Sequence, residues 1–197
     1  MNRKKLIYGR GINDVNFHVK VNGKHINSYK VWRSAFNRCY AKNDIGHIRA
    51  YKDAEVCKEW WYYSKFLEWY NDNYIEGYVL DKDICNTTNT KLYCPQNCSF
   101  VPQSLNNLIS NGGVKNSKYT RGITKQKNGK KFKVAIGDGT GGSNKIGMYE
   151  TIDEAKIAYK TAKEAHVKSV ATEYYAKGKI NERVYQALMK YEVEITD

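Results

Sequence analysis

The first half of the chain combines helical apolar stripes with short strand patterns. Apolar residues at helical spacing predict one helix over 28–40, with Ser28 as its N-cap, and a second helix over about 58–74. A strand is predicted over 17–21, ahead of the turn-forming pair Asn22-Gly23. Further on, the pattern reads strand, loop, strand and helix, at 78–84, 86–90, 91–93 and 102–110. We interpret this last group as a hairpin packed on a helix.

The second half has the pattern of a three-stranded sheet followed by helices. The strands are predicted at 119–125, 131–136 and 145–149. Thr151 and Glu154 have capping-box spacing and predict the start of a long helix. We expect its buried face to carry Ile152, Ala155, Ala158, Tyr159, Ala162, Ala165 and His166. A last helix is predicted from Asn181 to Tyr191, and the fold class is therefore α+β.

A change of pattern suggests two modules. The polar, glycine-containing segment 111–118 has linker composition and separates residues 1–110 from residues 119–197. All five cysteines lie before it. The aromatic stripes of the first module are interpreted as core rather than as a binding platform.

Charge brings in a class of partner. The net charge is +13, from 33 basic and 20 acidic residues, which favours a polyanion such as nucleic acid. The alternative is that the positive charge serves solubility. The sequence contains no apolar run of membrane-spanning length and no signal-peptide pattern, so we expect a cytoplasmic protein that does not enter membranes.

Three blocks in the strand–loop–strand–helix segment carry a family resemblance. They are Leu80-Asp81-Lys82-Asp83-Ile84, Asn97-Cys98-Ser99-Phe100-Val101-Pro102 and Asn106-Asn107. Over residues 78–110 the chain resembles the ββα-metal core of the HNH endonuclease superfamily, and its setting is similar to phage-encoded HNH-like proteins. The resemblance implies metal-dependent phosphodiester cleavage with Mg²⁺ or Mn²⁺.

The same resemblance assigns roles by position. Asp81 and Asn106, or its neighbour Asn107, correspond to metal ligands, and Asn97 corresponds to a residue that holds the loop or orients the base. Lys82 stands where the family has its histidine base. An ordinary lysine has a pKa near 10.4 and is protonated at neutral pH, so it cannot accept a proton. The segment is therefore a nuclease with an altered base, a degenerate HNH scaffold that binds nucleic acid without cleaving, or an unrelated hairpin.

Four of the cysteines raise the question of zinc. Cys57, Cys85, Cys94 and Cys98 supply enough thiolates for a structural zinc site, and some HNH proteins carry one. Their spacing is not that of two C-x2-C knuckles, and free cysteine is a common small core residue. Cys39 lies in a helical stripe and is interpreted as core. A disulfide framework is not expected in a cytosolic chain.

Four blocks in the second module carry another resemblance. They are Tyr119-Thr120-Arg121-Gly122-Ile123, residues 131–136, Ile146-Gly147-Met148-Tyr149 and residues 151–159. Over residues 118–172 the chain resembles the APETALA2/ERF-type DNA-binding domain, which implies that a three-stranded sheet enters the major groove of double-stranded DNA.

Charge supports this module independently. Between Lys115 and Lys133 the chain has eight basic residues and no acidic one. We expect Arg121 to contact base edges, and the lysines of the same tract to contact phosphates or flank them, namely Lys118, Lys125, Lys127, Lys131 and Lys133.

The leading hypothesis is a DNA-binding HNH-like protein of phage origin, with homing-type, metal-dependent phosphodiester cleavage as its candidate activity. The alternative is a catalytically silent DNA-binding protein that acts as a regulator or in counter-defence. A third class is a protein-interaction module with an acidic protein partner, or with RNA in a ribonucleoprotein.

Overall fold

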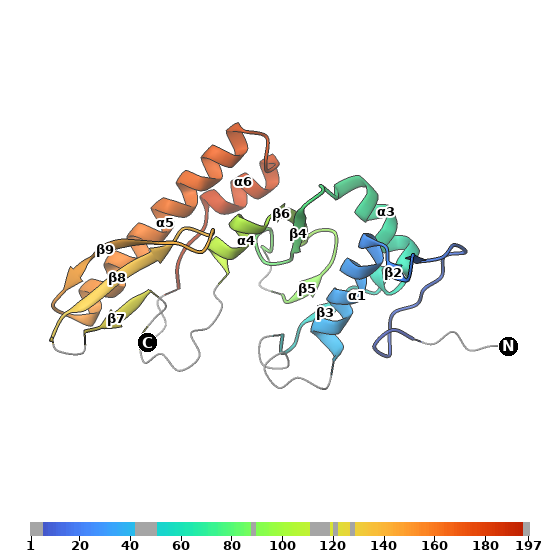
Figure 1. Ribbon diagram of the computed structural model, residues 1–197, viewed down its shortest axis with the longest axis horizontal. Helices are drawn as coiled ribbons and strands as arrows, with labels where there is room; N and C mark the ends of the chain where they lie inside the picture. The colour runs from blue at the N-terminus through green and yellow to red at the C-terminus, as the bar shows by residue number, and fades with distance from the viewer. Residues whose placement is uncertain are drawn as a thin grey trace. The chain divides into compact units, whose positions relative to one another are not determined.

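The structure is a computed structural model that describes residues 6–41, 51–87, 90–110, 119, 122–126 and 129–194. It divides into two compact units, residues 1–100 and 101–197 (Figure 1). The division falls before the helix at 103–109 rather than at the predicted linker 111–118, which lies outside the described residues. The fold class is α+β, as predicted.

The first unit begins with a small hairpin and a helix. The elements are β1 (Lys20–Val21), β2 (Lys24–His25), α1 (Asn27–Tyr40), β3 (Glu55–Val56), the 3-10 helix η1 (Glu59–Trp61), α3 (Tyr63–Asn73), β4 (Tyr78–Asp81) and β5 (Leu92–Tyr93). Helix α1 confirms the prediction for 28–40, but Ser28 is not its N-cap. The Ser28 hydroxyl is buried within the helix and lies 2.7 Å from the Tyr63 hydroxyl.

The helix predicted over 58–74 is interrupted. Tyr62 has an extended backbone (φ −92°, ψ 122°) between η1 and α3. This break allows Ile12 to bridge to Tyr62, with the Ile12 amide donating to Trp61 O at 2.7 Å and the Tyr63 amide donating to Ile12 O at 3.0 Å. A tertiary contact with the N-terminal segment therefore overrides the helical pattern of the sequence.

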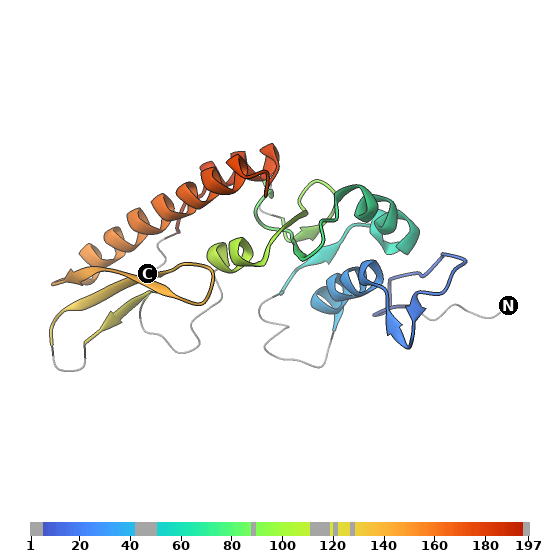
Figure 2. The same cartoon turned by 45° about the horizontal axis from the view of Figure 1, so that its top comes forward.

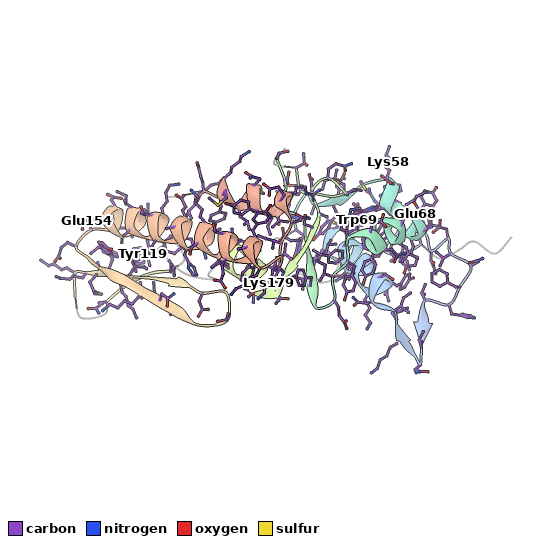
Figure 3. The ribbon with its side chains drawn as sticks, turned by 90° about the horizontal axis from the view of Figure 1, so that it is seen from above. Lys58, Glu68, Trp69, Tyr119, Glu154 and Lys179 are labelled. Carbon is purple, nitrogen blue, oxygen red and sulfur yellow. The ribbon has the colours of Figure 1, made fainter. Side chains whose placement is uncertain are left out.

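Aromatic rings fill the core of the first unit. Trp32, Phe36, Trp60, Tyr63 and Phe66 have no exposed surface. Trp69 of α3, labelled in Figure 3, lies with its ring centroid 4.8 Å from that of Trp60. The interpretation of these stripes as core is confirmed, and the tilted and T-shaped ring pairs are those that aromatic quadrupoles favour.

The pairing of the short strands corrects the predicted hairpin. β5 does not return along β4 but pairs in parallel with β3, with Val56 opposite Tyr93. β4 pairs instead with β6 (Ser99–Pro102). The turn after β5 reverses the chain, since the amides of Asn97 and Cys98 both donate to Cys94 O, and this brings the next strand beside β4.

The second unit is a sheet covered by one long helix. β7 (Ile123–Lys125), β8 (Phe132–Gly137) and β9 (Ser143–Tyr149) form an antiparallel sheet in that order, and α5 (Ile152–Ala176) lies across one face of it (Figure 1). The capping box of Thr151 and Glu154 is formed, as predicted. α4 (Gln103–Ile109) and α6 (Glu182–Met189) pack on α5.

The buried face of α5 differs in part from the predicted one. Ala155 and Tyr159 are buried on the sheet, as expected, whereas Ala165 is exposed. Lys163 is instead 7% exposed, and its Nζ donates to Leu108 O at 2.5 Å. A carbonyl in the last turn of α4 thus accepts a hydrogen bond from a cation, which explains why the buried face of α5 contains a lysine.

Gly122 sets how closely α5 packs on the sheet, and we predict that Gly122→Ala destabilises the second unit. Gly122 has φ +83°, and an added Cβ would lie 2.4 Å from both Ala135 O and the Tyr159 ring. We expect a loss of roughly 2–4 kcal/mol in the free energy of unfolding, measured in urea. Gly129→Ala is the control, because its nearest neighbouring atom would lie 3.6 Å away. Equal stability of the two variants would contradict this packing.

Candidate nucleic-acid interface and HNH-like segment

The sheet of the second unit has one covered and one exposed face. Ile123, Phe132, Val134 and Ile136 are buried on the side of α5. Residues opposite one another in the register share a face. The other face therefore carries the rows Thr124–Lys133–Met148 and Ala135–Lys145, and we call these five residues the outer sheet face.

The outer sheet face is cationic and partly apolar. Lys133 and Lys145 are exposed on the two neighbouring strands β8 and β9. A register shift after Val134 leaves Ile146 without a paired residue, and its side chain is 36% exposed beside Lys145. Bulges of this kind redirect side chains at the surface of a sheet. The arrangement suits a ligand with negative charges and some apolar surface.

The predicted DNA-binding residues are distributed unevenly. Lys118, Arg121 and Lys127 lie outside the described residues. Lys133 is on the outer sheet face. Lys131 is exposed just before β8, and its Nζ pairs with Glu150 Oε1 at 2.7 Å, which raises the pKa of Lys131.

Lys125 lies on the opposite face of the sheet from Lys133, because its register partner is the buried Phe132. It lies opposite Phe132 on the covered side, at the edge strand, with its Nζ 5.7 Å from the Phe132 ring centroid. Lys145 was not predicted from the sequence. Lys145 lies in the third predicted strand, and this position could have indicated it. Its pairing with Ala135, however, depends on a bulge that shifts the register by one residue.

The HNH-like segment places two charged residues at the end of β4. Asp81 Oδ1 accepts hydrogen bonds from the amides of Asp83 and Ile84, both at 2.8 Å. Burial raises the pKa of Asp81, although these two amide bonds oppose the rise. Lys82 is 7% exposed, and its Nζ donates to Asp83 Oδ1 at 2.5 Å. Lys82 is thus a donor in a partly buried ion pair.

The asparagines of the segment are mostly engaged in holding the backbone. Asn97 is buried, and its Nδ2 donates to Leu92 O at 3.0 Å, which fixes the turn after β5. Asn106 lies on α4 in the second unit. The Asn107 side chain accepts from Gln103 and donates to Gly139 O at 3.3 Å.

Arg38 of α1 contacts Tyr93 of β5, which lies within this segment. The Arg38 guanidinium donates to the Tyr93 hydroxyl at 3.3 Å, and burial raises the pKa of that tyrosine. Burial works against the charge of Arg38, but Tyr93, Tyr51 and Asp81 outweigh it and raise the Arg38 pKa. Lys82 Nζ lies 5.7 Å from the Tyr93 ring centroid. Arg38 is far from Asp81 in the sequence, so no local pattern indicated that the two residues interact.

Three of the cysteines, Cys57, Cys94 and Cys98, lie near one another, and Cys85 contacts Ser99 instead. Cys57 and Cys94 follow the paired strands β3 and β5, and Cys98 donates its amide to Cys94 O at 2.9 Å. Burial raises the pKa of Cys98 well above its usual value, although its hydrogen bond with the Cys94 backbone opposes the rise. Cys85 lies apart, with its Sγ 3.3 Å from the Ser99 hydroxyl. All five cysteines are free thiols.

Metal-ligand geometry is absent from the described part of the chain: no three His, Cys, Asp or Glu residues there gather around a common point. The zinc site and the Asp81–Asn106 metal site therefore both stay predictions. Within the same residues, no helix is long and apolar enough to cross a membrane.

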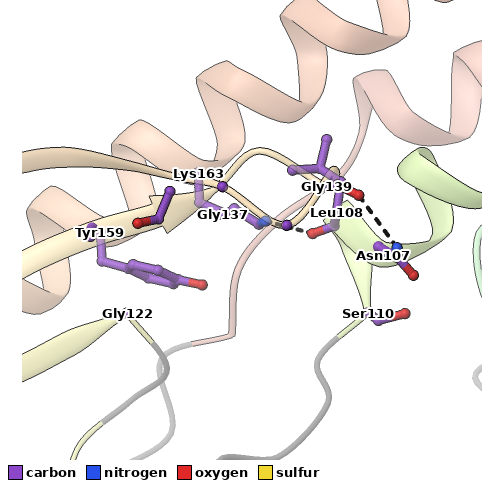
Figure 4. A pocket seen from close by; sticks show the side chains of 12 residues that line it. Asn107, Leu108, Ser110, Gly122, Gly137, Gly139, Tyr159 and Lys163 are labelled. Carbon is purple, nitrogen blue, oxygen red and sulfur yellow. Dashed lines mark hydrogen bonds between the residues drawn. The ribbon is translucent and has the colours of Figure 1, made fainter.

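A cavity of about 530 Å³ lies on the α5 side of the sheet (Figure 4). Tyr159 and Lys163 of α5 line it together with the glycine-rich hairpin between β8 and β9. The hydrogen bonds drawn there, from Lys163 to Leu108 O and from Asn107 to Gly139 O, fasten α4 to α5 and to this hairpin. Its polar groups therefore serve the packing of the second unit.

Comparisons with known proteins give no relative: no protein-family model matches the chain, and neither the curated proteins nor the solved structures include a significant match.

The buried thiols predict that stability falls at alkaline pH. Burial raises the pKa of Cys39 to about 12 and that of Cys57 to about 11, from an ordinary value of 9.0. The folded thiols keep their protons where unfolded thiols lose them, so this stability is complete below pH 9 and is lost as the pH rises toward 11 for Cys57 and toward 12 for Cys39. Urea unfolding across that range should show a shallower decline for Cys39→Ala/Cys57→Ala than for the native chain. Parallel declines would exclude these thiols as the cause.

Proposed function

We propose that this protein binds double-stranded DNA through the outer sheet face of its second unit. The proposal rests on one observation, a three-stranded sheet covered by α5 on one side and bearing exposed Lys133 and Lys145 on the other. A sheet of this width fits the major groove, where lysines on adjacent strands reach phosphates. The net charge of +13 and the resemblance to APETALA2/ERF-type domains support the same partner.

The HNH-like segment, in this proposal, contributes to binding rather than to cleavage. Lys82 donates to Asp83 and has no lone pair to accept a proton while it does so. One oxygen of Asp81 already accepts two backbone amides. Asp81 and Lys82 are therefore a poor ligand set for Mg²⁺ or Mn²⁺.

The proposed function is therefore that of a DNA-binding protein of the regulatory or counter-defence type.

Metal-dependent cleavage is the second candidate function, and a specific observation favours it. Asp81 Oδ2 accepts no hydrogen bond from any described residue, and Arg38 lies close enough to be stabilised by this carboxylate. In a phosphodiester site, the arginine would bind the phosphate and the carboxylate oxygen would ligate a divalent cation.

For the binding proposal, the decisive variant is Lys133→Glu/Lys145→Glu. We expect its affinity for a labelled duplex to fall at least tenfold, because two cations are replaced by charges that repel phosphate. Fluorescence anisotropy measured over a range of salt concentrations gives both the affinity and its salt dependence. Lys177→Glu/Lys190→Glu changes the charge of the same unit equally, at exposed positions on other elements. Equal losses in both variants would indicate a general charge effect and contradict docking by the outer sheet face.

The cleavage alternative is tested on supercoiled plasmid with Mg²⁺ or Mn²⁺. We expect no nicking by the native protein, because the position of the base holds an engaged lysine. Metal-dependent nicking that disappears in Asp81→Ala would contradict this expectation and establish the second candidate. Nicking that persists in Asp81→Ala would point to a contaminating nuclease, which a repeat purification removes.

A further inference from the structure

The hairpin β1–β2 projects from the body of the first unit (Figure 2). Lys20 pairs with His25 and Val21 pairs with Lys24, so the two lysines lie on opposite faces of the ribbon. Asn22 and Gly23 at its tip both have positive φ, +49° and +74°, as a tight two-residue turn requires. The hairpin thus presents cations on both sides of a narrow, two-stranded element.

A strand pair of two residues each is too short to be stable by itself, and contacts with α1 hold it. The His25 ring lies 4.8 Å from the Tyr29 ring, centroid to centroid. Arg33 Nη1 lies 3.1 Å from His25 Nε2, so the arginine donates to the imidazole, and His25 Nδ1 lies 3.3 Å from Val19 O. These bonds fix the hairpin against the start of the helix.

The charge around the hairpin has no acidic counterpart in the sequence. From Val15 to Asn43 there is no acidic residue, and the basic residues are Lys20, Lys24, Lys30, Arg33, Arg38 and Lys42. Elsewhere in the described chain, exposed lysines pair with carboxylates, as Lys65 does with Glu68 and Lys177 with Glu173. Across the described residues no carboxylate forms an ion pair with Lys20, Lys24 or Lys30.

Exposed apolar side chains accompany these lysines. Val21, on the same face as Lys24, is 60% exposed, and Phe17 just before the hairpin is 46% exposed. An unpartnered apolar side chain next to unneutralised cations fits a ligand that offers phosphates together with sugar and base edges. A duplex carries phosphates on both sides of a groove, which cations on opposite faces of the ribbon can contact together, and this favours a duplex over an acidic peptide.

We propose that the β1–β2 hairpin is a second DNA-contacting element, which places Lys20 and Lys24 on the phosphates of a duplex. A two-stranded ribbon is narrow enough for the major groove, and lysines on its two faces reach the phosphates on either side. This inference rests on the proposed function only in its choice of double-stranded DNA as the partner. The hairpin belongs to the first unit, so it is an additional contact and not part of the outer sheet face.

The test compares the salt dependence of duplex binding in matched variants. Each phosphate contact contributes about 0.9 to the slope of log affinity against log salt concentration, so Lys20→Gln/Lys24→Gln should reduce the slope by about 1.8. Lys20→Arg/Lys24→Arg should keep the native slope. Lys58→Gln/Lys65→Gln removes the same charge from exposed positions beside acidic residues, and should also keep it; Lys58 is labelled in Figure 3.

The outcomes separate this inference from the proposed function. A native slope in Lys20→Gln/Lys24→Gln, together with weakened binding in Lys133→Glu/Lys145→Glu, would overturn the hairpin contact and leave the sheet interface standing. The converse pattern would support the hairpin and overturn the sheet interface. An absence of salt-dependent duplex binding in the native protein would overturn both. Tighter, hairpin-dependent binding of an RNA duplex of the same sequence would overturn the choice of DNA.

Discussion

The packing of α5 across one face of the sheet determines what the second unit can do. A three-stranded sheet is too small to bury both faces, and α5 covers one of them with Ala155 and Tyr159. Gly122 permits the close approach of the Tyr159 ring, and the capping box at Thr151 sets where the helix begins. The apolar residues of the strands are buried on that side, and the opposite side carries the exposed lysines Lys133 and Lys145. The proposed DNA interface is therefore a consequence of one-sided packing.

The first unit has a different balance between core and charge. Its core is a cluster of aromatic rings, and its charged residues at the end of β4 are satisfied largely by one another and by the backbone. Asp81 and Lys82, which the sequence resemblance singled out, form hydrogen bonds that fix the turn after β4. Lys20 and Lys24 of the β1–β2 hairpin form no ion pair with any carboxylate of the described residues. These two cations, which a polyanion could contact, lie far from residues 78–110 in the sequence.

Local patterns predicted the elements better than their partners. α1, the long capped helix α5 and the three strands of the second unit follow from periodicity and capping chemistry, which act within a few residues. The break at Tyr62 and the pairing of β5 with β3 arise from distant segments, which no local pattern contains. The burial of Lys163 depends on the last turn of α4, and the place of Lys145 depends on a bulge. Of the candidate site, the lysines before and within β8 were predictable, whereas Arg38, Tyr93 and Lys145 required the fold.

The most direct test of the central claim is a nuclear magnetic resonance titration of isotope-labelled protein with an unlabelled DNA duplex. The account predicts that amide and lysine side-chain signals of β8 and β9 shift together, including those of Lys133 and Lys145, while signals on the exposed side of α5 stay in place. Saturating duplex that shifts α5 and α6 but leaves Lys133 and Lys145 unchanged would contradict the assignment of the outer sheet face as the DNA interface.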